Sequence, residues 1–296
     1  AVFGPGCPAA YAFVGPDADE RLFGLVQEFV VGRTVRDTAA LLGCVSLPAP
    51  GDPFIITQPR RPFIEEIDTP PGKLSIAFSA ESWTGMEVNP EVAGKVKEVA
   101  RLCEEMGHHV ADAKPQFDLE PYFGALGVMW GSSIGYACIR LSEIMNRPID
   151  ADHLEPVTLS IYENSRKYTA NDVISAKIAL NTVRRKVGQF FETYDLLLTP
   201  TLAQLPVALG TIDLNHDDGL EAWEYGTGQF TAFTNLGNAT GFPAISLPLC
   251  QSADGLPIGV QFMAGFGEEA LLLRVAGAFE NALPWIDRRP PVHVSR

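Results

Sequence analysis

The chain has 296 residues, of which 46% are hydrophobic and 20% are charged, as is typical of globular proteins with a buried core. Its formal net charge of −14 argues against a nucleic-acid partner, because nucleic-acid surfaces need clustered Lys and Arg side chains. No uninterrupted apolar run in the sequence approaches the length of a membrane span, so we also expect no membrane partner.

The first part of the chain is predicted to form a short helix, followed by a strand–helix–strand unit. Thr34 opens a short helix, and Asp37 three residues later completes a capping-box pattern. Residues 74–78 are predicted to form a strand, and Asn89 is predicted to cap the helix that follows it. A strand at 109–113 completes a right-handed βαβ unit. The apolar stripe of the second helix comprises Val92, Val96, Val99, Cys103 and Met106.

The middle of the chain is predicted to contain two long helices and a buried strand. Residues 122–145 are mostly helical in pattern, and Thr169 with Asp172 forms a second capping box. The helix after Thr169 repeats apolar residues every three or four positions, and we interpret its opposite, basic face as solvated. A short apolar strand at 194–198 follows. The basic face consists of Arg184, Arg185 and Lys186.

The C-terminal third is organised around a predicted hairpin. Residues 244–249 and 257–263 are short apolar runs of the kind that form buried strands, and Asp254-Gly255 marks the turn between them. A helix at 268–282 follows directly. Strands and helices in this order indicate an α/β fold, in which helices flank both faces of a mixed β-sheet.

Two short patterns have a chemical interpretation that their surroundings do not support. Residues 131–135 read G-x-S-x-G, which is the nucleophile elbow of α/β-hydrolases with Ser133 as the nucleophile. An elbow needs a strand–turn–helix context, whereas this stretch looks helical throughout, so we favour an ordinary helix. His108 and His109 are adjacent but lack other ligand-type spacings, so we interpret them as a surface turn and predict no metal site.

Three longer strings in the C-terminal third carry a family resemblance. They read N-L-G-N-A-T-G-F-P-A-I-S-L-P-L at 235–249, D-G-L-P-I-G-V-Q at 254–261 and L-L-L-R-V-A-G-A-F-E at 271–280. In this order they resemble the C-terminal part of the amidase signature family, which hydrolyses C–N bonds of amides. The string at 282–290 looks closest to the branch of aminohexanoate cyclic dimer hydrolase-like amidases. The resemblance implies the C-terminal share of an amidase signature fold.

The resemblance implies a catalytic machinery that this sequence does not contain. Family members use a Ser–cis-Ser–Lys triad and a loop reading G-G-S-S-G-G, all in the first half of their fold, with no metal and no cofactor. This chain has no G-G-S-S-G-G, so no catalytic residue is carried over. We expect residues 15–296 to be the C-terminal part of an amidase domain, and we leave out residues 1–14, which lack the family's pattern.

Two hypotheses about function follow. In the first, the chain is the substrate-pocket half of an amidase from a truncated or split gene, and it works with a small amide substrate and the missing N-terminal half in trans. In the second, it is a non-catalytic, amidase-derived binding or assembly subunit. Candidate substrate-binding residues under the first hypothesis are Met129, Trp130, Phe230, Phe233, Thr234 and Asn235.

Some of these residues, and the nearby Asn238, also have an ordinary structural interpretation. Met129 and Trp130 are equally well explained as core residues. Asn235 and Asn238 could bond the amide groups of a substrate or merely close a turn. The sequence leaves these alternatives open.

Compartment and association are the last two expectations. The five Cys residues stand apart without a C-x-x-C pair, which favours free thiols and a cytoplasmic protein. If half of the fold is missing, the apolar strands at 194–198, 244–249 and 257–263 should be left uncovered. The isolated chain would then self-associate, a homo-oligomer being one form of this.

Overall fold

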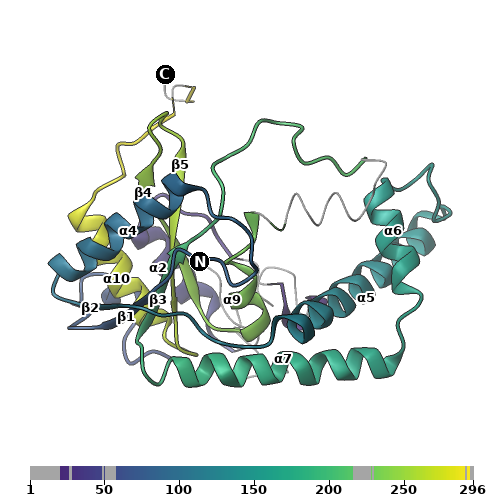
Figure 1. The fold of residues 1–296 in the computed structure, drawn as a ribbon, viewed down its shortest axis with the longest axis horizontal. Helices are drawn as coiled ribbons and strands as arrows, with labels where there is room; N and C mark the ends of the chain where they lie inside the picture. Colours follow the sequence, from purple (N-terminus) through teal and green to yellow (C-terminus); the bar gives the residue numbers. More distant parts are fainter. Residues whose placement is uncertain are drawn as a thin grey trace.

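One mixed sheet, with strand order β2-β1-β3-β5-β4, lies at the centre of the structure (Figure 1). The computed structural model describes residues 21–26, 29–48, 50, 58–215, 228, 230–290 and 292–293, so the predicted boundary after residue 14 lies outside the described residues. The strands are β1 (Ser75–Phe78), β2 (His109–Asp112), β3 (Leu196–Pro200), β4 (Ala244–Gln251) and β5 (Pro257–Ala264).

The pairing of these strands confirms the predicted mixed α/β sheet. β1 pairs in parallel with both β2 and β3, while β5 runs antiparallel to β3 and to β4. The chain passes from β1 to β2 through helix α4 (Pro90–Glu105), which is the predicted βαβ unit. The path from β2 to β3 then crosses over β1, because β3 lies on the other side of that strand.

The predicted hairpin exists within the larger sheet, where β5 lies between β3 and β4 and only β4 is at the border. β4 is the last strand in the order, and its exposed Ser246 and Pro248 alternate with buried neighbours. The register between β4 and β5 shifts between Leu247 and Cys250, around Pro248. A proline lacks the N–H that a central strand needs, so it marks an edge strand or a bulge. Pro248 was therefore the sequence signal for an edge position.

Helices cover both faces of the sheet, as predicted. Besides α4, they are η1 (Arg21–Gly24), α2 (Val35–Val45), α3 (Phe63–Glu66), α5 (Leu119–Met145), α6 (Pro156–Ser165), α7 (Ala170–Phe190), α9 (Asn235–Thr240) and α10 (Glu269–Ala282). Ile76 and Leu196 belong to the core shared with α2, α3, α4 and α10. Ala77 and Leu197 face the opposite layer, formed by α5, α7 and α9, because strand side chains alternate between faces.

The predicted helix starts are confirmed. Asp37 N donates to Thr34 Oγ1 over 3.0 Å, and Glu91 N donates to Asn89 Oδ1 over 2.9 Å. At Thr169 both halves of the capping box with Asp172 are present. The basic face of α7 needs one correction, since Arg184 Nε donates to the carbonyl of Thr240 over 3.0 Å and so contacts the end of α9.

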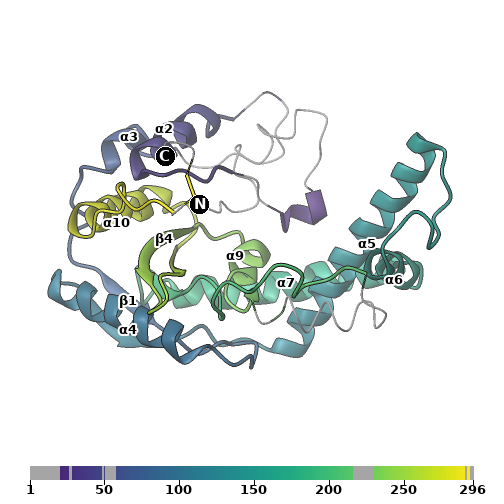
Figure 2. The same ribbon diagram turned by 90° about the horizontal axis from the view of Figure 1, so that it is seen from above.

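Helices α5 and α6 project away from the sheet as an arm, and α7 returns from the arm to the sheet (Figures 1 and 2). The expectation that the strands are left uncovered is wrong for β3 and for most of β5. All five residues of β3 are buried, and most of β5 is buried as well. The large apolar side chains that are exposed are concentrated on α5 instead.

A pH-dependent stability is expected from Glu269, which is buried in the first turn of α10. Burial raises the pKa of its carboxyl group, because it disfavours the charged form. The folded state thus holds this proton more tightly than the unfolded chain does. The corresponding stability is present below the unfolded-state pKa and is lost as the pH rises through the folded-state pKa.

Replacing Glu269 by Gln should remove this loss of stability at high pH. We expect Glu269→Gln to be more stable than the wild type at pH 8, and the two proteins to converge below about pH 4. Urea unfolding curves recorded between pH 4 and pH 8 measure the difference. The exposed neighbour provides the control, since Glu268→Gln should keep most of the pH dependence. An unchanged pH profile in Glu269→Gln would contradict the prediction.

Candidate functional site

Two loops meet where the parallel strands β1 and β3 end. In open α/β sheets, ligands bind outside the carboxyl ends of strands at the point where the chain turns from one side to the other, which here lies between β1 and β3. Asn89 N donates to the carbonyl of Ala203 over 2.9 Å. Gln204 Nε2 donates to the carbonyl of Glu87 over 2.8 Å. The loop 79–89 and the segment 201–204 are therefore joined into one surface.

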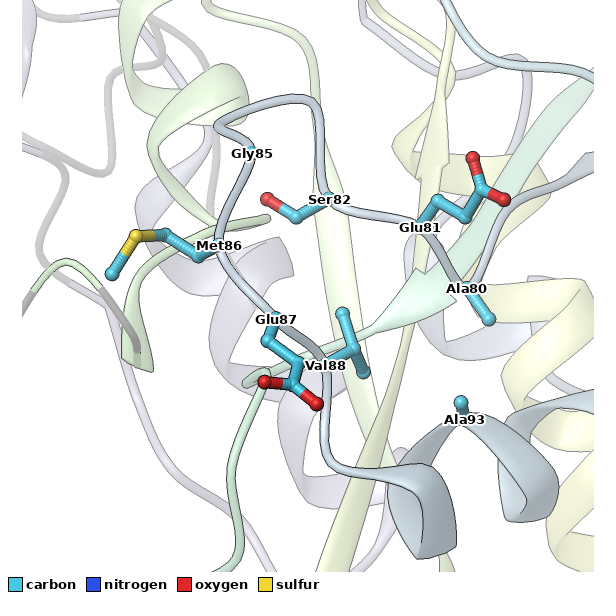
Figure 3. Close-up of a pocket in the computed structure, with 8 residues that line it drawn as sticks. All are labelled: Ala80, Glu81, Ser82, Gly85, Met86, Glu87, Val88 and Ala93. Atoms are coloured by element: carbon cyan, nitrogen blue, oxygen red, sulfur yellow. The ribbon is translucent and has the colours of Figure 1, made fainter.

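The loop after β1 lines an open pocket of about 400 Å³ (Figure 3). This volume falls within the range of small-molecule sites. Two of the lining side chains are carboxylates, those of Glu81 and Glu87, and Glu81 lies 3.1 Å from the ammonium group of Lys114. The remaining lining residues are Ala80, Ser82, Gly85, Met86, Val88 and Ala93. An acidic lining of this kind suits neutral or cationic small molecules better than anions.

An aromatic cluster lies beside this loop and holds two of the predicted site residues. Phe233 and Met129 are both buried, and they share one core with Trp83 and Tyr122. The ring of Trp83 meets that of Phe233 edge to face, with centroids 5.3 Å apart. Met129 therefore has the core role that the sequence left open, and Phe233 is a core residue as well.

Asn235 is fixed by this cluster through a single hydrogen bond. The hydroxyl of Tyr122 donates to Asn235 Oδ1 over 3.2 Å. Burial raises the pKa of Tyr122, so its hydroxyl keeps the proton that it donates. With Oδ1 engaged, the amide Nδ2 of half-buried Asn235 has no partner among the described residues and remains available as a donor.

The other predicted site residues lie at different places around the cluster. Trp130 is 39% exposed and lies on the outer side of α5. Phe230 and Thr234 are half-buried and precede α9, where Thr234 is the N-cap residue without a capping side-chain bond. Asn238 has the structural role, because its Nδ2 donates to the carbonyl of Leu25 over 2.7 Å.

Sequence reasoning missed Trp83 and Tyr122. Tyr122 was placed only at the start of a helix, although it is fully buried and carries the bond to Asn235. Trp83 is 6% exposed, and its Nε1–H has no acceptor among the described residues. A buried donor without a partner is rare and costs free energy. An aromatic residue in an otherwise polar loop after a strand was the available signal.

The nucleophile-elbow interpretation of Ser133 is excluded, because residues 131–135 lie in the middle of α5. Their glycines have a packing role. A Cβ atom on Gly135 would lie 2.0 Å from Ser165 Oγ, and one on Gly131 would lie 3.0 Å from the ring of Tyr168. The glycines thus let α5 approach α6 and the residues that follow it.

The histidine pair is part of the sheet region and not a separate turn. His109 begins β2, and the ring Nδ1 of His108 accepts from Leu74 N over 3.3 Å. Partial burial lowers the pKa of His108. Among the described residues, no group of three or more His, Cys, Asp or Glu could hold a metal ion. No helix in the described ranges is both long and apolar enough to cross a membrane.

Sequence comparisons match this chain to the amidase family. A family model described as Amidase matches residues 21–273. The chain is 33% identical over 278 residues to a 6-aminohexanoate-cyclic-dimer hydrolase of Paenarthrobacter ureafaciens, a match that covers 92% of this chain and 56% of that protein. An enzyme of the same name from Pseudomonas sp. (strain NK87) is 33% identical over 282 residues, with the same coverage of both chains. The chain thus spans about half the length of these curated relatives.

Structural comparison gives the same result. A structure of 6-aminohexanoate cyclic dimer hydrolase complexed with substrate superposes with a TM-score of 0.89 at 32% identity, and the match covers 98% of this chain and 61% of that one. A bacterial aryl acylamidase superposes with a TM-score of 0.77 at 21% identity, which shows the shared fold.

The packing role of the α5 glycines can be tested with a matched pair of substitutions. Gly135→Ala should lower the free energy of unfolding by about 1–3 kcal/mol, because the new methyl group overlaps Ser165. Gly124→Ala in the same helix meets no atom within 4 Å and should raise it by up to ~1 kcal/mol. Adding Ser165→Gly to Gly135→Ala should recover much of the loss. Equal stability of the two alanine variants in chemical denaturation would refute this role.

Proposed function

The chain belongs to the amidase family, and from this membership we propose that it supplies the substrate-pocket share of an enzyme that hydrolyses C–N amide bonds. The observation that carries the proposal is the arrangement at the carboxyl ends of β1 and β3. There a small-molecule pocket adjoins an aromatic cluster that orients the free amide donor of Asn235. Apolar walls with a few directed polar groups are what small-molecule sites require.

The nucleophile in this proposal comes from a different stretch of polypeptide. Amide hydrolysis needs an activated nucleophile and donors for the developing oxyanion. The printed sequence contains no G-G-S-S-G-G loop, and its one elbow-like serine is in a helix. The curated hydrolases are longer than their match to this chain, which covers 56% of their length. We assign the Ser–Ser–Lys triad to a polypeptide that corresponds to the unmatched part of these relatives.

The pocket residues have defined tasks in this assembly. Asn235 Nδ2 donates to the carbonyl oxygen of a bound amide, and the Tyr122 hydroxyl keeps the side chain in that orientation. Phe233 and Met129 are buried in the same cluster as Tyr122, so their task is to support the side chains that contact the amide. Phe230, Thr234 and Trp130 are the further candidates for contact with the amide, at half-buried or exposed positions. The substrate class is a neutral linear or cyclic amide, and the relatives named for a cyclic dimer favour the cyclic form.

One prediction of the proposed function distinguishes this assembly from an enzyme that is active by itself. The purified chain should show no turnover of 6-aminohexanoate cyclic dimer, because it lacks both the nucleophile and the oxyanion donors. Mixing it with the part of the Paenarthrobacter ureafaciens hydrolase that it does not match should restore hydrolysis, measured by release of free amine. Turnover by the chain alone that disappears in Ser133→Ala would sink the proposal. Amide binding without hydrolysis in the mixture would favour the non-catalytic binding subunit.

The second prediction tests Asn235 against its neighbour Asn238. In the assembled protein, Asn235→Ala should weaken binding of a secondary amide about tenfold, as expected for one lost hydrogen bond of ~1.4 kcal/mol. Asn238→Ala loses only its bond to Leu25 and should lower stability without changing amide affinity. Calorimetric titration and thermal unfolding measure the two effects.

A stability control completes this test. Asn235→Ala leaves the buried Tyr122 hydroxyl without an acceptor, so it should also destabilise the fold. Adding Tyr122→Phe should recover the stability but not the amide affinity. Equal affinities for Asn235→Ala and Asn238→Ala would show that Asn235 has no role in binding.

A further inference from the structure

Trp83 carries a buried hydrogen-bond donor that the fold does not use. Two buried side-chain atoms of the described residues have no hydrogen-bond partner, Glu66 Oε1 and Trp83 Nε1. The first is compensated by charge, because Arg61 Nε lies 3.1 Å from it. The indole N–H of Trp83 has no such compensation. Buried polar groups without a partner are rare in native proteins, and a ligand is one of the few reasons for which they are kept.

Another tryptophan shows how the same fold treats a buried indole elsewhere. Trp285 is 8% exposed and Trp83 is 6% exposed, so the two rings are buried to the same degree. The Nε1 of Trp285 donates to the carbonyl of Arg33 over 2.9 Å. This is the usual arrangement, because the N–H of a buried tryptophan normally finds an acceptor. Trp285 is therefore the reference against which Trp83 can be judged.

The other polar groups near Trp83 are satisfied within its own loop. Ser82 Oγ accepts from Thr84 N over 3.0 Å, and Thr84 Oγ1 accepts from Met86 N over 3.4 Å. The two ends of the loop are bonded to the rest of the fold at Ser79 and Glu87. No hydrogen bond joins residues 82–86 to another part of the described chain. The loop tip 82–86 can therefore shift as a unit between fixed ends.

Trp83 links the pocket to the cluster beside Asn235. Its neighbour Ser82 lines the pocket (Figure 3), while the ring of Trp83 meets that of Phe233 edge to face. Phe233 lies two positions before Asn235, whose Nδ2 also has no partner among the described residues. The loop and the start of α9 thus bring two donors without acceptors, Trp83 Nε1 and Asn235 Nδ2, to the same cluster.

Two donors without acceptors suit a ligand that brings acceptors. The carbonyl oxygen of an amide is such a group, since it accepts up to two hydrogen bonds and has no net charge. A carboxylate suits the site less well, because Glu81 and Glu87 line the adjoining pocket and would repel it. The chemistry of the site therefore favours the carbonyl oxygen of a neutral amide.

We propose that Trp83 is a second amide-recognition residue, whose Nε1–H donates to a carbonyl oxygen of the bound amide beside the donor of Asn235. The inference rests on the proposed function and adds a specificity-determining residue to its site. The indole N–H is covered in the ligand-free chain, so the amide reaches it when the loop tip 82–86 shifts. Binding then supplies the bond that the empty fold lacks, which favours amides over ligands of the same shape without a carbonyl group.

The indole N–H can be observed directly by NMR in the purified chain labelled with ¹⁵N-tryptophan. The four tryptophan signals are assigned from single Trp→Phe variants. Titration with 6-aminohexanoate cyclic dimer should move the Trp83 signal downfield and slow its exchange with heavy water. The Trp285 signal should stay in place, because its N–H is already bonded to Arg33. A purely structural role of Trp83 would not produce a new hydrogen bond to its N–H.

The matched variants are Trp83→Phe and Trp285→Phe. Trp83→Phe keeps an aromatic ring next to Phe233 but removes the donor, so it should weaken binding of the cyclic dimer about tenfold. Trp285→Phe loses its bond to Arg33 and should be less stable, with wild-type affinity for the amide. Thermal unfolding and circular dichroism check the folding of both. The NMR titration of the wild-type chain decides the question if Trp83→Phe does not fold.

An unmoved Trp83 signal, or wild-type affinity in a folded Trp83→Phe, would overturn the inference. If Asn235→Ala still weakens amide binding in that case, the proposed function stands without Trp83. No binding of the cyclic dimer by the wild-type chain would overturn both.

Two further outcomes would assign the N–H of Trp83 to another acceptor. If the linear dimer, which carries a carboxylate, binds more tightly than the cyclic dimer and moves the same signal, the acceptor is a carboxylate. If the N–H is already protected from exchange in the ligand-free chain and shows a cross-peak to water, the acceptor is a buried water molecule. Either result contradicts the inference.

Discussion

Strand β3 is the element on which the rest of the structure depends. It is parallel to β1 on one side and antiparallel to β5 on the other, so it joins the βαβ unit to the C-terminal hairpin. All of its side chains are buried, and they alternate between the two core layers. A strand in this position accepts only apolar or small residues, which explains the run of three leucines at 196–198. Its carboxyl end also fixes where the pocket loops can meet.

Local signals were enough to predict most of the elements. Capping residues such as Thr34, Asn89 and Thr169 report on a few neighbouring backbone groups, and each is confirmed. The parallel and antiparallel character of the sheet also followed from the order of strands and helices. The hydrophobic periodicity does not predict where a strand lies within the sheet, because the sequence of β4 is as apolar as that of a central strand although β4 is the last strand in the order. Only Pro248 distinguished it.

The candidate site was harder to predict than the fold, because it depends on contacts between distant residues. Asn235 was selected from a string near the hairpin, but its partner Tyr122 lies 113 positions earlier on another helix. No spacing rule connects two such residues. Trp83 is a similar case, since its burial against Phe233 depends on how the loop after β1 folds back. Residues that are adjacent in sequence can also differ in burial, because Met129 is buried in the core whereas Trp130 is exposed.

The edge formed by β4 has a consequence for recognition. Extended peptides can bind a protein by adding a strand to an open sheet edge, and each added residue needs free backbone donors and acceptors. At Pro248 the N–H is missing, and the carbonyl accepts a bond from Arg288 Nη1 over 2.7 Å. The shift in register beside it bends the strand further. An extended peptide is therefore not expected to add as a further strand beside β4.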